Sequence, residues 1–138
     1  VFRHRKTPEN FVVLSGDVHY SFVYDVELRG RRRGPDIWQV CSSGLRNTFP
    51  ERLLGVLDHL NRWLYSPRSP LNWFTRRRHM RVIPRKPEGT PHGRRLLNAS
   101  GIGLVELDAE GRPWRIRQLV EGGERVTFTR REGESRWD

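Results

Sequence analysis

Cysteine, lysine and long apolar runs are all scarce in this 138-residue sequence. The single cysteine, Cys41, excludes an internal disulfide framework and a zinc cluster built from cysteines, and it leaves the redox compartment open. No apolar run approaches the roughly 20 residues that span a bilayer, and the basic start of the chain resembles no signal peptide. We therefore expect a soluble chain without a membrane span. Whether it is cytoplasmic or exported stays unknown at this stage.

Arginine supplies nearly all of the positive charge. The chain has 26 Lys+Arg against 16 Asp+Glu, a formal net charge of +10, and only Lys6 and Lys86 are lysines. Such a preference for arginine is typical of proteins from GC-rich genomes, which accounts for part of the charge. Residues 68–95 hold nine basic residues against one acidic residue, so this segment is where a phosphate-bearing partner would be attracted.

The first third of the chain has the pattern of strands. Residues 11–14 form a short apolar run that predicts a buried strand ending at a Gly turn. Residues 21–28 alternate, with Phe22 and Tyr24 on one face and Asp25 on the other, which predicts a half-buried strand. Residues 37–41 predict a third strand, joined to the second as a hairpin.

A helix and a long loop are expected in the middle of the chain. Residues 49–65 predict an amphipathic helix, because its apolar side chains recur at helical spacing on one face: Leu53, Val56, Leu57, Leu60, Trp63 and Leu64. Thr48 and Glu51 have the spacing of a capping box at its start. Residues 65–96, rich in Pro and Arg, predict a loop excursion with a short strand at 80–83.

The last third returns to strands, at 101–107, 114–120 and 125–129, which predict a meander with one solvated face. The length fits one domain with its own core. Together these patterns predict a β-rich α/β fold. Trp38, Trp63, Trp73 and Trp114 are expected in the core or at an interface, and Cys41 is expected to be a buried, unreactive thiol.

The sharpest chemical signal is the segment Ser15-Gly16-Asp17-Val18-His19 at the end of the first strand. Ligands and metals collect where buried strands end. Asp17 and His19 are two residues apart, so in an extended segment a carboxylate oxygen and an imidazole nitrogen point to the same side. Taken alone, the pair also fits a turn-capping Asp and a hydrogen-bonded structural His.

The wider segment from Phe11 to Ser21 resembles the last metal motif of PhoD-type alkaline phosphatases, members of the calcineurin-like metallophosphoesterase superfamily. The superfamily often has Gly-His-x-His at this strand end, and Asp17 and His19 match the Gly-Asp-Val-His form of PhoD-like members. The Ser42-Ser43-Gly44 strand end and residues 97–108 are also similar to the C-terminal part of that family. The likeness spans residues 11–120.

The resemblance implies that residues 1–138 are the C-terminal portion of a single metallophosphoesterase domain, a layered β-sandwich with flanking helices. The family's upstream Asp, Asn and His motifs are not in this sequence. We therefore expect the chain alone to be incomplete and inactive, contributing part of a dinuclear metal site through Asp17 and His19. The intact enzyme would hydrolyse phosphoesters, monoesters or diesters. Iron and calcium are the metals the resemblance suggests, with manganese or zinc as alternatives.

Candidate phosphate-binding residues are basic. Arg46 and the cluster Arg76, Arg77 and Arg78 offer guanidinium groups, although the pattern favours a solvated basic loop over phosphate binding. Two other functions stay open. One is a basic module that binds nucleic acid through residues 68–95. The other is a non-catalytic β-rich domain in which Asp17 and His19 have only structural roles.

Overall fold

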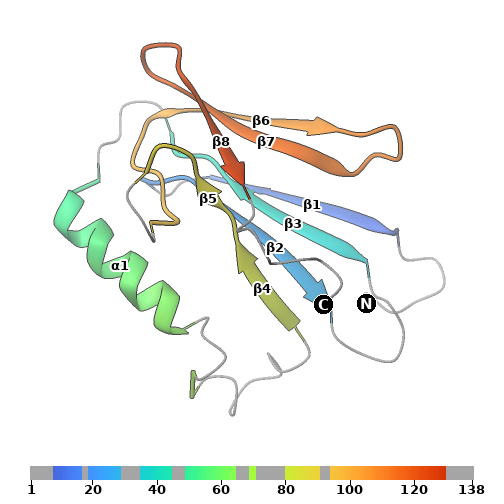
Figure 1. Ribbon diagram of the computed structural model, residues 1–138, viewed down its shortest axis with the longest axis horizontal. Helices are drawn as coiled ribbons and strands as arrows, with labels where there is room; N and C mark the ends of the chain where they lie inside the picture. The colour runs from blue at the N-terminus through green and yellow to red at the C-terminus, as the bar shows by residue number, and fades with distance from the viewer. Residues whose placement is uncertain are drawn as a thin grey trace.

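The computed structural model shows a β-rich α/β fold (Figure 1). Within the described part of the chain, two four-stranded sheets and one helix are present. The described residues are 8–16, 19–28, 35–44, 49–64, 69–70, 80–90 and 94–129. Among these residues, no helix is long and apolar enough to cross a membrane.

The first sheet combines parallel and antiparallel pairing. Its strands, in spatial order, are β1 (Asn10–Ser15), β3 (Asp36–Cys41), β2 (Phe22–Leu28) and β4 (Met80–Pro84). β2 is antiparallel to both β3 and β4, whereas β1 is parallel to β3. The predicted hairpin and the predicted short strand at 80–83 are therefore confirmed.

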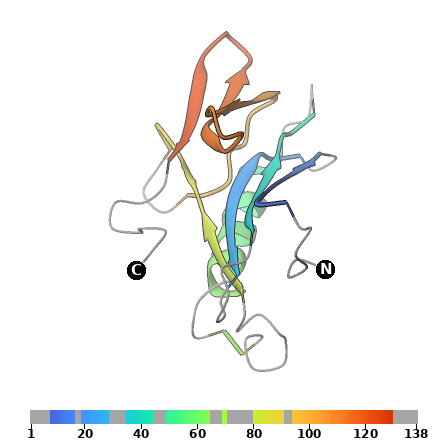
Figure 2. The same cartoon turned by 90° about the vertical axis from the view of Figure 1, so that its right-hand side faces the viewer.

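The second sheet is antiparallel throughout. Its order is β5 (Lys86–Pro87), β8 (Arg125–Thr129), β7 (Pro113–Val120) and β6 (Gly101–Leu107). The predicted meander of β6, β7 and β8 is confirmed, and its turns contain Gly111 and Gly123 at positive φ. Only Arg85 separates β4 from β5, so the chain passes directly from the first sheet to the second (Figure 2).

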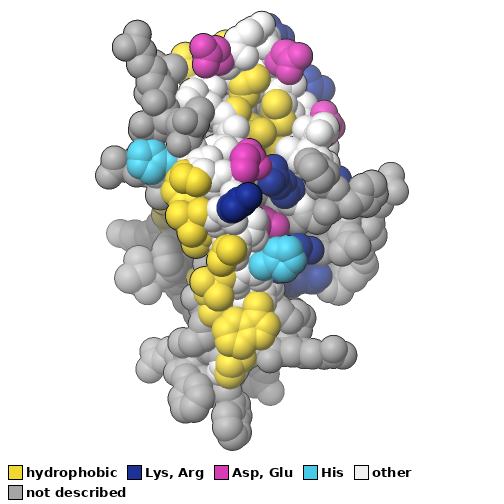
Figure 3. Space-filling model, turned by 90° about the vertical axis from the view of Figure 1, so that its left-hand side faces the viewer, with side chains coloured by type: hydrophobic (Ala, Val, Ile, Leu, Met, Phe, Trp, Pro, Cys, Tyr) yellow, Lys and Arg dark blue, Asp and Glu magenta, His cyan; other side chains and the backbone are white. Residues whose placement is uncertain are grey.

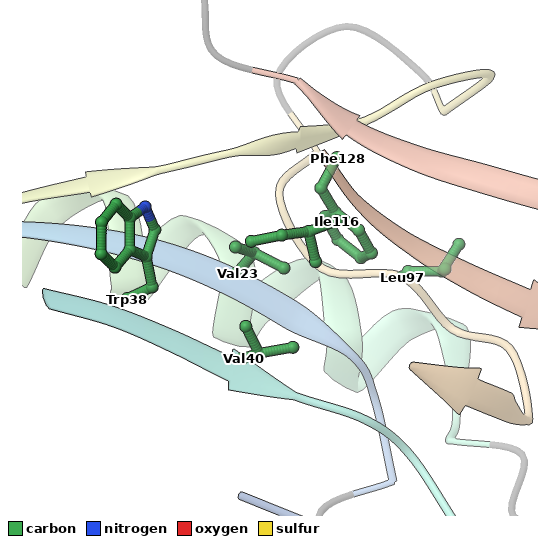
Figure 4. Packing of buried hydrophobic residues seen from close by; sticks show 6 residues of the cluster. All are labelled: Val23, Trp38, Val40, Leu97, Ile116 and Phe128. Carbon is green, nitrogen blue, oxygen red and sulfur yellow. The ribbon is translucent and has the colours of Figure 1, made fainter. Parts of the chain in front are cut away.

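The main core lies between the two sheets. Six buried side chains form it, contributed by β2, β3, the segment before β6, and strands β7 and β8 (Figure 4). They are Val23, Trp38, Val40, Leu97, Ile116 and Phe128. Trp38 is completely buried, which confirms its expected place in the core. The second sheet thus covers β2 and β3 rather than the whole first sheet.

Helix α1 (Glu51–Leu64) lies within the predicted range and packs beside the first sheet. Its inward face carries Leu54 and Asp58, which are 1% and 3% exposed. Asp58 accepts a hydrogen bond from the Arg95 backbone N–H at 3.1 Å, and Asn61 donates to the hydroxyl of Tyr24 on β2. These polar contacts set the rotation of the helix.

Because of this rotation, the apolar face that the sequence predicted to be buried is largely exposed. Four of its six members point away from the sheet, with between 48% and 62% of their surface exposed. They are Leu53, Val56, Leu60 and Trp63, which we call the α1 seam. The side chains that share the inward side with Leu54 are Leu57, Asp58, Asn61 and Leu64. The periodicity located the helix correctly but not the side that the sheet buries.

The prediction of a buried first strand is wrong. β1 is an edge strand, and neither the second sheet nor α1 covers it. Val13 is 47% exposed on one face and Leu14 is 72% exposed on the other. An apolar run alone cannot distinguish a central strand from an edge strand, because both have the same local sequence.

Two further expectations need correction. β2 is covered on both faces, since Tyr24 is 6% exposed and Asp25 is 1% exposed. Burial of Asp25 is tolerated because the Arg85 guanidinium donates to both of its carboxylate oxygens, at 3.0 and 3.2 Å. The predicted excursion at 65–96 is also only partly a loop, because β4 and β5 connect both sheets within it.

Candidate functional site

The candidate site lies where the parallel strands β1 and β3 end. Because the two strands run in the same direction, their carboxyl ends meet at one edge of the sheet. The Ser42 backbone N–H donates to the Ser15 carbonyl at 3.2 Å and holds the two ends together. Gly16 follows β1, and Ser43 and Gly44 follow β3. Small residues therefore frame this edge.

His19 is the one predicted metal ligand within the described residues. It is exposed, and its ring stacks on Phe49 with centroids 6.2 Å apart and an interplanar angle of 29°. Tyr20 meets Phe49 edge to face at 5.7 Å. Since Phe49 lies two residues before α1, these aromatic contacts place the imidazole near the N-terminus of the helix. That end of a helix favours negatively charged groups.

Asn98 fixes the chain at the start of α1. Its side-chain oxygen accepts from the Phe49 backbone N–H at 3.1 Å, and its amide nitrogen donates to the Phe49 carbonyl at 2.8 Å. The same nitrogen donates to Glu51 at 2.9 Å. The aromatic partner of His19 is thus held by both of its backbone polar groups.

The Glu51 carboxylate completes this arrangement. Arg94 donates to it at 2.7 Å, next to the bond from Asn98. These hydrogen bonds, first from Asn98 and then from Arg94, lower the pKa of Glu51 below its ordinary value. The predicted capping box pairs Glu51 with Thr48, which lies outside the described residues; the described partners of Glu51 are Asn98 and Arg94.

The end of β3 is bound to both sheets. The Ser43 backbone N–H donates to the buried Ser21 hydroxyl at 2.8 Å. Gln118, itself 1% exposed, donates from its amide to the Ser42 hydroxyl at 3.1 Å. The backbone comes close here too, because a Cβ on Gly103 would lie 3.3 Å from the Ser42 Cβ. The Ser-Ser-Gly segment is therefore a rigid part of the site.

Most of the predicted site residues lie outside the described residues. Asp17 and Arg46 are among these, as are Arg76, Arg77 and Arg78. The structure therefore brings His19 together with Phe49, next to the start of α1, and it does not describe the rest of the predicted set. Over the described ranges, no group of three or more His, Cys, Asp and Glu side chains is arranged to hold a metal ion.

The described residues could supply only part of a metal site. His19 offers an exposed imidazole at a strand end, a good nitrogen donor for first-row metals. A hydrolytic metal centre needs three or more protein ligands, and His19 supplies one. Cys41 does not add to the set, because it is 2% exposed and burial raises the pKa of its thiol, as expected of an unreactive cysteine.

Several supporting residues were missed from the sequence. Asn98, Ser21 and Gln118 all hold the site through hydrogen bonds to segments far away in the chain. Their residue types gave no distinctive local signal. Asn98 and Ser21 belonged to stretches with the family likeness, but those stretches did not indicate the contacts that the two side chains make.

Comparisons with protein-family models, with curated proteins and with solved structures found no match to this chain.

Proposed function

We propose that this chain is the C-terminal segment of a PhoD-like, metal-dependent phosphoester hydrolase. The observation that carries the proposal is the position of His19. Its imidazole is exposed at the carboxyl edge of the parallel pair β1 and β3 and stacks on Phe49 beside the start of α1. This is where a metal or phosphate site is expected in an α/β sheet. The segment also has the Gly-Asp-Val-His motif, with Asp17 two residues before His19.

The exposed edge strand supports the same proposal. Parallel strands in α/β proteins are covered on both faces, yet Val13 and Leu14 of β1 are exposed on opposite faces. A preceding part of the domain, placed against β1, would cover both. The layered β-sandwich of the metallophosphoesterases would then include the two sheets of this chain, and the remaining ligands would come from the preceding part.

In the intact enzyme His19 would bind one metal through a neutral ring nitrogen, and Asp17 would bind or orient the other. When bound, the metals of such a site hold the phosphate, lower the pKa of a bridging water and stabilise the charge of an in-line displacement. Phe49 would keep the imidazole plane fixed, since its ring stacks on it. Arg46 and Arg76 to Arg78 are the proposed phosphate contacts. Iron and calcium are the proposed metals, with manganese or zinc as alternatives.

Nucleic-acid binding is the weaker candidate. It requires the basic residues of 68–95 to form a free, positively charged surface. Arg85 is instead buried against Asp25, and Arg94 binds Glu51. These contacts favour a structural role for two of the nine basic residues in the segment.

The test uses the protein with its preceding sequence. Metal content and hydrolysis of a chromogenic phosphoester are measured for His19→Ala, with His59→Ala on the exposed side of α1 as the matched control. We expect His19→Ala to lose metal and activity and His59→Ala to keep both. Undiminished metal and activity in His19→Ala would refute the proposal. Tight, steeply salt-dependent DNA binding without hydrolysis would favour the basic module instead.

A further inference from the structure

The α1 seam is an ordered apolar stripe with nothing from its own sheet against it. Leu53, Val56, Leu60 and Trp63 are spaced by three, four and three residues, which is the a/d pattern of a helix that packs along another helix. Figure 3 shows hydrophobic side chains in a column down this side of the molecule. The helix has 14 residues, so the seam runs over most of its length.

Both acidic side chains of α1 are turned away from the seam. Glu51 binds Asn98 and Arg94, and Asp58 binds the Arg95 backbone, all on the side of the helix that faces residues 94–98. At 100° per residue, that side lies about half a turn from the seam. The acidic groups of α1 are therefore engaged elsewhere.

Two side chains flank the seam instead. Arg52 and His59 directly precede Leu53 and Leu60. Arg62 lies farther round the helix, where it pairs with Asp58 at 3.7 Å and contacts Nε2 of His59 at 3.4 Å. Arg52 and His59 are exposed, at the positions that flank an a/d stripe. In Figure 3 a histidine and basic side chains lie next to the hydrophobic column. A docked helix would thus meet apolar contacts along its centre and the Arg52 guanidinium on one flank.

We propose that the α1 seam binds an amphipathic helix that carries Asp or Glu along one flank. Charge complementarity decides against a second copy of this chain. In a two-fold antiparallel pair the same flank of each helix faces its equivalent, so the Arg52 flank of one copy would face the Arg52 flank of the other, and each copy has a net charge of +10. An acidic partner helix pairs with this flank and covers all four apolar side chains. This inference goes beyond the proposed hydrolase and does not depend on it.

The test uses a designed, fluorescent amphipathic peptide about as long as α1, with Leu at its a/d positions and Glu at its flanking positions. A second peptide has Lys in place of Glu. Binding to the 138-residue chain is followed by fluorescence anisotropy. We expect the Glu peptide to bind about tenfold tighter than the Lys peptide at low salt, and Arg52→Glu to reverse that preference.

Two variants locate the binding. Val56→Glu and Leu60→Glu put charge into the seam at exposed positions. We expect each variant to bind the Glu peptide about tenfold or more weakly than the unchanged chain does. Ile102→Glu is the matched control, because Ile102 is similarly exposed on β6. Circular dichroism verifies that each variant keeps its fold.

Three results would overturn the inference. One is a folded chain that does not bind the Glu peptide. The second is equal loss of binding in Ile102→Glu, which would indicate unspecific apolar adhesion. The third is self-association in sedimentation experiments that Leu60→Glu abolishes, which would make a second copy of the chain the occupant.

Discussion

The side chains between the two sheets and those along β1 and α1 are equally apolar but differ in exposure. Trp38, Val23 and Ile116 are at most 1% exposed, whereas Leu14 and Trp63 are 72% and 56% exposed. Single exposed apolar residues are common on protein surfaces and need no explanation. A strand and a helix that each expose a row of them mark an interaction surface.

The polar contacts of the two regions explain why the apolar side chains between the sheets are buried and those along α1 are exposed. Between the sheets, Arg85 binds Asp25 and Gln118 binds Ser42, so these polar side chains have hydrogen-bond partners. On the other side, Asp58 and Asn61 turn the helix so that its more apolar side faces outward. Hydrogen bonds thus decide which apolar surface is used within this chain and which is left for a partner.

The two tryptophans give the largest expected contrast. Trp38→Ala removes a fully buried ring from the core and should lower the free energy of unfolding by about 3–5 kcal/mol. Trp63→Ala removes a ring that is 56% exposed and should cost less than about 1 kcal/mol. Urea unfolding of both variants measures the difference. Similar losses would mean that Trp63 is packed within this chain and that the α1 seam is not an open surface.

Two glycines test the contrast between the packed sheets and the exposed helix at the level of the backbone. A Cβ on Gly101 would lie 2.1 Å from the Leu119 carbonyl oxygen, so Gly101→Ala should destabilise the chain by about 1–3 kcal/mol. A Cβ on Gly55 in α1 would have no other part of the fold within 4 Å, so Gly55→Ala should stabilise the folded chain by about 0.5–1 kcal/mol. Thermal unfolding separates the two. A stable Gly101→Ala would show that β6 and β7 can move apart.

The elements were predictable from the sequence because their signals are local. Alternation located β2, β6 and β7, and helical spacing located α1 to within two residues of its ends. The rotation of α1 was not predictable, because Asp58 and Asn61 looked like solvent-facing residues. Their partners, at Arg95 and Tyr24, are each 37 residues away in the chain. The buried position of Asp25 likewise depends on Arg85, 60 residues away.

Of the candidate site, the sequence singled out Asp17 and His19, whose role as metal ligands stays a prediction. His19 stands out because a Gly-Asp-x-His motif follows an apolar strand, and the structure places it at the carboxyl edge of β1 and β3. Its stacking on Phe49 depends on how α1 begins, and that depends on Asn98. Neither contact has a sequence pattern of its own. Local motifs therefore suggested the chemistry, whereas the supporting residues emerged from tertiary contacts.

The smallest expected effect concerns pH at the start of α1. Hydrogen bonds from Asn98 and Arg94 lower the pKa of Glu51, so the folded state favours the ionised carboxylate. Glu51 should therefore stabilise the fold fully above its ordinary pKa of 4.5, and this stabilisation should be lost as the pH falls through the lowered, folded-state pKa. Glu51→Gln should remove this part of the acid sensitivity, which melting curves below pH 4.5 would measure.

Asn98→Ala sharpens that experiment, because it removes the largest cause of the lowered pKa and leaves Arg94 in place. It should reduce the acid sensitivity less than Glu51→Gln does, and the double variant should behave like Glu51→Gln alone. Glu88→Gln, on an exposed turn after β5, controls for the loss of one surface carboxylate. If Glu51→Gln and Glu88→Gln have the same pH dependence, the bonds from Asn98 and Arg94 do not favour the ionised Glu51 carboxylate, and the start of α1 is held by the bonds between Asn98 and the Phe49 backbone alone.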